Sequence, residues 1–247
     1  MTGQPAVAEF PYCHACDNFR DGPPRTCLAC ASQQLARPGK DACGICSQRL
    51  DASGVCPNEL CRSSRRRISK IHAIGYQSGP LRGAINSYKY RGTRSWSVVL
   101  GRLLLAWLEE TMAVDPPDLI VANPGYCGPG GDFAHAEAVL RAAAVADAGH
   151  RWPFDTGSPA AVVKVRRTLK SADAQAWSKR VTGNELRAAL RVPDPARTAG
   201  KFTLVYDDVC TTGTQLDAVA TRLLDDGRAA RVEAVVLARA PWRGTSG

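Results

Sequence analysis

From residue 71 onward, short apolar runs alternate with amphipathic stretches. Apolar runs of four to eight residues predict buried strands, and apolar residues spaced three and four apart predict helices. The strands are predicted at 67–77 (a strand or hairpin), 118–124, 160–165, 201–208 and 231–238. The helices are predicted at 79–92, 95–112, 132–149 and 214–227, and 171–190 is helical or loop. Strands alternating with helices favour parallel pairing with right-handed crossovers, as in an α/β fold.

The first part of the chain lacks these runs and is rich in cysteine, glycine, proline and arginine. Eight of the ten cysteines lie between Cys13 and Cys61. A segment of this size and composition needs staples to hold a core. The basic stretch Arg62–Lys70 separates it from the α/β pattern. We therefore predict a small cysteine-rich module at 1–68 and an α/β domain at 69–247.

The cysteines of the module form four close pairs. Two turns that each carry a pair of thiolates can close a tetrahedron around one zinc ion, so eight cysteines suffice for two structural zinc sites. Consecutive pairs can share an ion, or the pairs can be cross-braced, and the count allows both. A disulfide framework is the alternative for a secreted protein. The predicted ligands are Cys13, Cys16, Cys27, Cys30, Cys43, Cys46, Cys56 and Cys61.

The formal net charge of +9 favours anionic partners such as phosphates or nucleic acid. Two zinc ions bound by eight thiolates would reduce it to roughly +5, which weakens that argument. The chain has no apolar run of transmembrane length, and its first residues do not resemble a signal peptide. We expect a cytoplasmic protein without a membrane span. Its reducing surroundings favour metal-bound cysteines over disulfides.

Two adjacent acids followed by a hydroxyl-rich turn stand between a predicted strand and a predicted helix, in the stretch "YDDVCTTGT". Ligands bind at the carboxyl ends of strands in open α/β sheets. Backbone N–H groups at a helix N-terminus form a site for phosphate, and carboxylates suit sugar hydroxyls or a Mg²⁺ ion carried with the ligand. A phosphorylated ribose combines these features. The expected ligand-binding segment is Asp207, Asp208, Val209, Cys210, Thr211, Thr212, Gly213 and Thr214.

Other interpretations of this stretch are a plain polar turn and a nucleotide-binding acid pair. The second would need a G-x-x-x-x-G-K-[ST] loop, and the sequence contains none. It also lacks a G-x-G-x-x-G run after a strand, which argues against a dinucleotide-binding fold.

The acids followed by x-x-Thr-Thr-Gly resemble the type I phosphoribosyltransferase family. The segments Tyr76–Arg82 and Lys89–Gly92, following a cysteine-rich module, are similar to its ComF/GntX group. The resemblance implies binding of 5-phosphoribosyl-1-pyrophosphate with Mg²⁺. It implies catalytic roles for Asp207, Asp208 and Lys89. It also places "KVRRTLK", with Lys164 and Arg166 as ligand-binding residues, at the family's mobile catalytic loop.

The sequence departs from that family where the pyrophosphate is expected to bind. The run 130–136 lacks the family's arginine and asparagine, and 123–128 is neutral. We expect other cations to compensate. The candidates are Lys89, Arg91, Lys164, Arg166, Arg167 and Lys170.

Three functions remain open from the sequence. The first is an enzyme that displaces pyrophosphate from ribose C1 with a nitrogen nucleophile, by positioning and charge neutralisation rather than a protein nucleophile. The second, which the resemblance implies through an association with DNA uptake, is an accessory that contacts single-stranded DNA or DNA-processing proteins. The third is a sensor that binds the ligand without catalysis.

Overall fold

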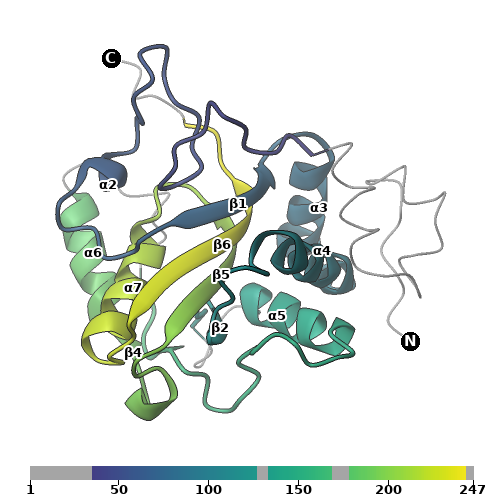
Figure 1. The fold of residues 1–247 in the computed structure, drawn as a ribbon, viewed down its shortest axis with the longest axis vertical. Coiled ribbons are helices and arrows are strands. Elements are labelled where there is room, and N and C mark those ends of the chain that lie inside the picture. The colour runs from purple at the N-terminus through teal and green to yellow at the C-terminus, as the bar shows by residue number, and fades with distance from the viewer. Residues whose placement is uncertain (1–34, 127–132, 169–177, 243–247) are drawn as a thin grey trace.

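A four-stranded parallel sheet lies at the centre of the structure, with strand order β1-β6-β5-β2 (Figure 1). The computed structural model describes residues 35–126, 133–168 and 178–242. Strands β1 and β2 form the edges of the sheet, and β5 and β6 lie between them. The bounds are β1 Ile71–Tyr76, β2 Leu119–Ala122, β5 Phe202–Cys210 and β6 Arg231–Arg239.

Helices cover both faces of this sheet (Figure 1). One face carries α3 (Gly79–Tyr90), α4 (Trp96–Thr111) and α5 (His135–Ala146). The other carries α6 (Ser178–Ala188) and α7 (Thr214–Asp225). The remaining elements are short: α2 Glu59–Arg62, β3 Val163–Lys164, β4 Leu190–Arg191 and the 3₁₀ helix Pro195–Arg197.

Each face of the sheet has its own hydrophobic core, because successive side chains of a strand point to opposite faces. On β5, Leu204 and Tyr206 pack with α3, α4 and α5, whereas Val205 packs with α7. All three side chains are fully buried. The two central strands are therefore apolar on both faces, and polar side chains on β5 stand out where the strand nears its carboxyl end.

Residues 35–68 lie along β1. The backbone N–H of Ile71 donates to the carbonyl of Ile45 at 2.7 Å, and that of Tyr76 donates to the carbonyl of Ala36 at 2.7 Å. Cys43 and Cys46 belong to the same core as α7. The described part of the cysteine-rich region thus shares a core with the α/β sheet.

The predicted fold class is confirmed: the chain forms a parallel sheet flanked by helices, with a cysteine cluster near its N-terminal side. The predicted strand at 160–165 is shorter and lies outside the main sheet. Only Val163 and Lys164 pair, antiparallel to β4. The N–H of Ala161 donates to the carboxylate of Asp155 at 2.6 Å, so it is not available to a neighbouring strand.

The strand predicted at 201–208 is longer than expected, because it continues to Cys210 through pairing with β6. Across the described ranges, no helix has both the length and the apolar character needed to cross a membrane.

Candidate functional site

The two adjacent acids lie near the carboxyl end of β5 and have different partners. Lys89 Nζ is 2.7 Å from Oδ2 of Asp208 and 3.0 Å from its Oδ1. Asn123, which follows β2, donates its side-chain amide to Oδ2 of Asp207 at 2.7 Å. Asp208 is buried, and Asp207 is partly exposed. Three segments far apart in the sequence therefore meet at the acid pair.

The close spacing of these groups changes their pKa values. Burial, together with the neighbouring carboxylate of Asp208, raises the pKa of Asp207 to about 7. Burial disfavours the charged form of Lys89, but Asp208 outweighs it and raises the pKa of Lys89. A lysine with a raised pKa thus faces Asp208, while the pKa of Asp207 lies near neutral. This second acid gains a full charge when a cation or a hydrogen-bond donor approaches.

The Thr211–Thr214 turn links β5 to α7. Gly213 is the N-cap of α7 and has a φ of 84°, a conformation that favours glycine. The hydroxyl oxygens of Thr212 and Thr214 are 3.0 Å apart. Within the described residues, the backbone N–H groups of Thr211, Thr212 and Gly213 meet no acceptor. Such a row of N–H groups at a helix N-terminus is suited to an anion.

A cavity of about 730 Å³ opens beside the acid pair. Asn123, Asp207, Asp208, Val209 and Gln215 line one part of it. Four cationic side chains also line it: Lys89, Arg94, Lys164 and Arg167. The cations outnumber the two acids, so the cavity suits a ligand that carries both hydroxyl groups and negative charge.

Aromatic side chains hold two of these cations in place. The guanidinium of Arg94 lies 4.5 Å from the ring centroid of Phe133, and that of Arg167 lies 5.9 Å from the ring centroid of Tyr126. Both rings line the cavity, as do Tyr88 and Tyr90. Stacking on a ring restrains an arginine while leaving its N–H groups available to a ligand.

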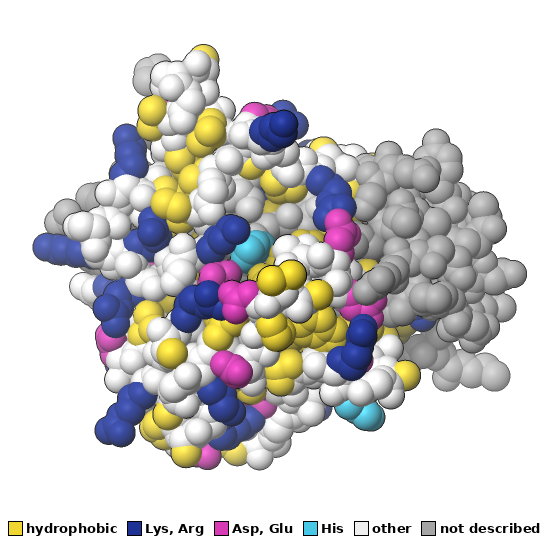
Figure 2. Space-filling model, in the orientation of Figure 1, with side chains coloured by type: hydrophobic (Ala, Val, Ile, Leu, Met, Phe, Trp, Pro, Cys, Tyr) yellow, Lys and Arg dark blue, Asp and Glu magenta, His cyan; other side chains and the backbone are white. Residues whose placement is uncertain are grey.

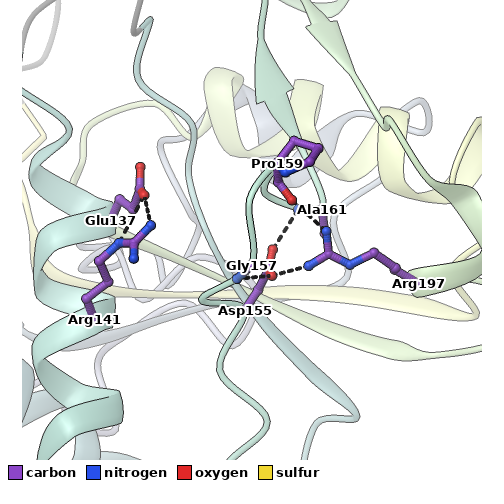
Figure 3. Close-up of polar contacts among 7 residues, drawn as sticks. All are labelled: Glu137, Arg141, Asp155, Gly157, Pro159, Ala161 and Arg197. Carbon is purple, nitrogen blue, oxygen red and sulfur yellow. Dashed lines mark hydrogen bonds and ion pairs between the residues drawn. The ribbon is translucent and has the colours of Figure 1, made fainter.

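A hydrogen-bonded loop around Asp155 lies between Phe154, which bridges to β2, and β3, which carries Lys164. The carboxylate of Asp155 accepts from the N–H groups of Gly157 at 3.2 Å and Ala161 at 2.6 Å, and it pairs with Arg197. Arg197 also donates to the carbonyl of Pro159 at 2.7 Å. Figure 3 shows these groups converging on Asp155, apart from the Glu137–Arg141 pair on α5. This loop leads into β3 and Lys164.

The structure brings some of the predicted ligand-binding residues together and separates others. Asp207, Asp208, Val209, Lys89 and Lys164 line the cavity, but Thr211–Thr214 and Cys210 do not. Arg166 is exposed and outside the cavity lining, whereas its neighbour Arg167 lines it. Residues 127–132 and Lys170, also considered from the sequence, lie outside the described residues.

The sequence did not identify Arg94 and Gln215 as cavity residues, nor Asn123 as the hydrogen-bond partner of Asp207. The Gln215 amide donates to Oδ1 of Asn123 at 3.2 Å, which extends the hydrogen-bond chain from Asp207. The one available signal was the position of Asn123 directly after a buried strand, where ligand-binding residues of α/β folds gather.

Four of the predicted metal ligands form a cluster, namely Cys43, Cys46, Cys56 and Cys61. Their sulfurs lie within 4.8 Å of one another, with Cys43–Cys61 at 3.8 Å and Cys46–Cys56 at 3.7 Å. Zinc–sulfur bonds of about 2.3 Å in a tetrahedron place sulfurs about 3.8 Å apart. The cluster therefore fits a zinc ion, and among the described cysteines the consecutive pairs come together. Cys13, Cys16, Cys27 and Cys30 lie outside the described residues.

The thiols of the cluster are coupled electrostatically. The hydrogen bond with Cys61 lowers the pKa of Cys46 to about 4, although burial opposes this. Burial raises the pKa of Cys56 to about 11. The thiols thus differ in how readily they ionise, and a bound cation would favour the thiolate form of all four.

Basic side chains on the surface do not gather in one patch on the face drawn in Figure 2. Lys and Arg side chains are scattered there, with Asp and Glu between them (Figure 2). In the basic stretch at 62–70, Arg66 donates to the carbonyls of Cys61 and Ile68, and Arg67 pairs with Asp225. Part of this stretch therefore serves contacts within the chain.

Neither a protein-family model nor a curated protein matches this sequence.

Proposed function

We propose that the cavity binds 5-phosphoribosyl-1-pyrophosphate with Mg²⁺, and that the protein is a phosphoribosyltransferase of the ComF/GntX type. The observation that carries this proposal is the acid pair beside a phosphate-suited turn, facing a cavity lined by four cations. In this arrangement the 5′-phosphate accepts hydrogen bonds from the Thr211–Thr214 turn. The ribose hydroxyls donate to the carboxylates of Asp207 and Asp208.

The pyrophosphate faces the cations in the proposed complex. The segment expected to bind it contributes Pro124, Gly125 and Tyr126 to the cavity, none of which is basic. Arg94, Lys164 and Arg167 line the same cavity and supply the missing positive charge. Burial lowers the pKa of Lys164. A bound pyrophosphate would raise this pKa again, because a nearby negative charge favours the protonated amine.

The proposed reaction breaks the bond between ribose C1 and the pyrophosphate oxygen and forms a bond from C1 to a nitrogen of the acceptor. The electron pair of the broken bond leaves with pyrophosphate, and the acceptor nitrogen releases its proton to solvent water. Positive charge develops at C1 in the transition state, near the two carboxylates. The cations of the cavity stabilise the leaving group, and a Mg²⁺ ion bound with the ligand would add to this stabilisation, so catalysis rests on positioning and electrostatics.

A sensor that binds the ligand without turnover is the second candidate, and the neutral 124–126 segment favours it. A titration of 5-phosphoribosyl-1-pyrophosphate with Mg²⁺ into the full chain, followed by a pyrophosphate-release assay with a panel of nitrogen bases, separates the two. Binding with release supports the transferase, and binding without release supports the sensor. If the ligand does not bind while single-stranded DNA binds in a salt-sensitive manner, the proposal is wrong and the DNA accessory is favoured.

A further inference from the structure

The Arg239 side chain is buried between the cysteine cluster and the Thr211–Thr214 turn. It lies at the carboxyl end of β6 and is fully buried. Its guanidinium is 2.8 Å from the sulfur of Cys210 and 3.7 Å from the sulfur of Cys46. It donates to the carbonyl of Cys210 at 2.9 Å and to the carbonyl of Thr211. Among the described residues, no carboxylate pairs with it.

A buried guanidinium is costly unless a negative charge compensates it. A divalent cation bound by four thiolates retains a net charge of about −2. The tetrathiolate formed by the cysteine cluster would supply the negative charge that Arg239 otherwise lacks among the described residues. The same guanidinium donates to the carbonyls of Cys210 and Thr211, at the start of the turn. One side chain therefore contacts both the cysteine cluster and the backbone of the turn.

Asn58 makes a second connection between the cluster and the turn. It lies in the segment between Cys56 and Cys61 and is buried. Its side-chain oxygen accepts from the N–H of Leu60 at 3.2 Å, which caps α2, and its amide nitrogen donates to the carbonyl of Thr212 at 3.1 Å. A Cβ added to Gly213 would lie 2.9 Å from Leu60, so this segment also packs directly against the turn.

These contacts fix the direction of the N–H groups that face a ligand. Arg239 holds the carbonyls of Cys210 and Thr211, and Asn58 holds the carbonyl of Thr212. The carbonyl and the next N–H of a trans peptide point in opposite directions. The N–H groups of Thr211, Thr212 and Gly213 are therefore presented on the side away from the cysteine cluster, as an anion site requires.

We propose that Arg239 and Asn58 are positioning residues that couple metal binding at the cysteine cluster to phosphate binding at the Thr211–Thr214 turn. Because coupling between two binding sites is reciprocal, zinc raises the affinity for the phosphate, and the phosphate raises the affinity for zinc by the same factor. The ligand part of this inference rests on the proposed function, whereas the ordering of the turn by the metal does not.

The test uses zinc-loaded full chain and ribose 5-phosphate as the probe. Asn58→Asp keeps the oxygen that caps α2 but replaces the donor to Thr212. It should weaken ribose 5-phosphate binding about fivefold, the effect of one hydrogen bond, with the zinc stoichiometry unchanged. Asn184→Asp adds the same charge at an exposed position and should bind as wild type does. Calorimetry measures both affinities.

Arg239→Lys keeps a positive charge but loses the forked geometry that reaches both sulfurs and both carbonyls. We expect it to weaken zinc binding, measured by competition with a chromogenic chelator, as well as ribose 5-phosphate binding. Saturating ribose 5-phosphate should tighten zinc binding about fivefold in the wild type and less in Asn58→Asp. Zinc affinity that does not respond to ribose 5-phosphate in a wild type that binds it would overturn the coupling.

Hydrogen exchange separates a failure of the coupling from a failure of the proposed function. If wild type does not bind ribose 5-phosphate, the proposed function falls, and the amides of Thr211–Gly213 still report the coupling. Partial zinc removal and Asn58→Asp should each speed exchange at these amides, while α5 keeps its protection. Unchanged exchange in the turn, or equal loss of protection in α5, would contradict a local coupling.

Discussion

The cysteine cluster lies beside Arg239 at the carboxyl end of β6, and the acid-lined cavity lies near the carboxyl end of β5, yet the two sites differ in how their charges are satisfied. The four sulfurs enclose one position, within 4.8 Å of one another. The acids and the four cations instead surround an open volume of about 730 Å³. Four sulfurs around one position suit a structural metal ion, whereas charged groups around an open cavity leave room for a small molecule to bind and dissociate.

The comparison shows that the two kinds of site differ less in their amount of charge than in whether each charged group already has a partner within the protein. The thiols of the cluster have one another as close neighbours, with Cys43–Cys61 at 3.8 Å and Cys46–Cys56 at 3.7 Å. At the cavity, Asp208 already has Lys89, while Asp207 has a neutral amide and a pKa of about 7. Asp207 is thus the group whose charge a ligand can still change.

The largest expected effect comes from opening the closed site. Cys46→Ala leaves three thiols, which cannot complete a tetrahedron around zinc, so we expect loss of bound zinc and a fall in Tm of about 10 °C. Cys210→Ala removes another buried cysteine that lies outside the cluster, and it should retain zinc with a much smaller fall in Tm. Metal analysis and thermal melts measure both. Equal losses in the two variants would show that the cluster is not a closed metal site.

A tenfold effect is expected at the acid pair. Lys89→Gln removes the cation that neutralises Asp208, so two carboxylates would then repel an approaching phosphate. The affinity for 5-phosphoribosyl-1-pyrophosphate with Mg²⁺ should fall about tenfold in a calorimetric titration. Lys70→Gln changes an exposed lysine that does not line the cavity and serves as the control. If both variants bind equally well, Lys89 has no role in binding.

A smaller effect distinguishes two neighbouring arginines. Arg167 lines the cavity and Arg166 does not, so Arg167→Gln should weaken binding of 5-phosphoribosyl-1-pyrophosphate about fivefold, with little change for ribose 5-phosphate. Arg166→Gln should leave both affinities unchanged. The paired titrations reveal whether cations of the cavity bind the pyrophosphate. The reverse result, with Arg166 the more important residue, would restore the assignment made from the sequence.

The smallest effect is the pH dependence of stability. In the folded protein the pKa of Asp207 is raised from the ordinary value of 3.8 to about 7. The free energy of unfolding contributed by this group therefore falls as pH rises from the ordinary pKa to the raised one. Asp207→Asn should remove this slope and raise Tm at pH 8 relative to wild type by about 3 °C. Asp226→Asn, near the end of α7, should keep the wild-type slope in the same thermal melts.

Local patterns predicted most of the fold. Short apolar runs placed β1, β2, β5 and β6, and helical spacing placed the helices between them, because these elements bury apolar side chains. The predicted strand ended at Asp208, where the apolar run gives way to the two acids. Backbone pairing with β6 extends the strand by two residues, through Val209 to Cys210.

The site was predictable only where its residues are neighbours in the sequence. The acid pair, the threonine–glycine turn and the Cys43–Cys61 spacing are local signals. Asn58 contacts a residue 154 positions away, and Asn123 contacts one 84 positions away. Their contacts depend on how the elements pack, so the sequence alone did not identify the residues that they contact. Arg166 and Arg167 are neighbours in the sequence, and of the two Arg167 lines the cavity, which their spacing does not reveal.

The central claim is that Asp207 and Asp208 bind the ribose of a phosphoribosyl ligand. Its most direct test is the affinity of the Asp207→Asn/Asp208→Asn variant for 5-phosphoribosyl-1-pyrophosphate with Mg²⁺, compared with that of Asp225→Asn/Asp226→Asn. The second variant removes an equal charge at the opposite end of α7, where the acids form exposed ion pairs. We predict about 100-fold weaker binding for the first and wild-type binding for the second. Equal affinity in both variants would contradict the claim.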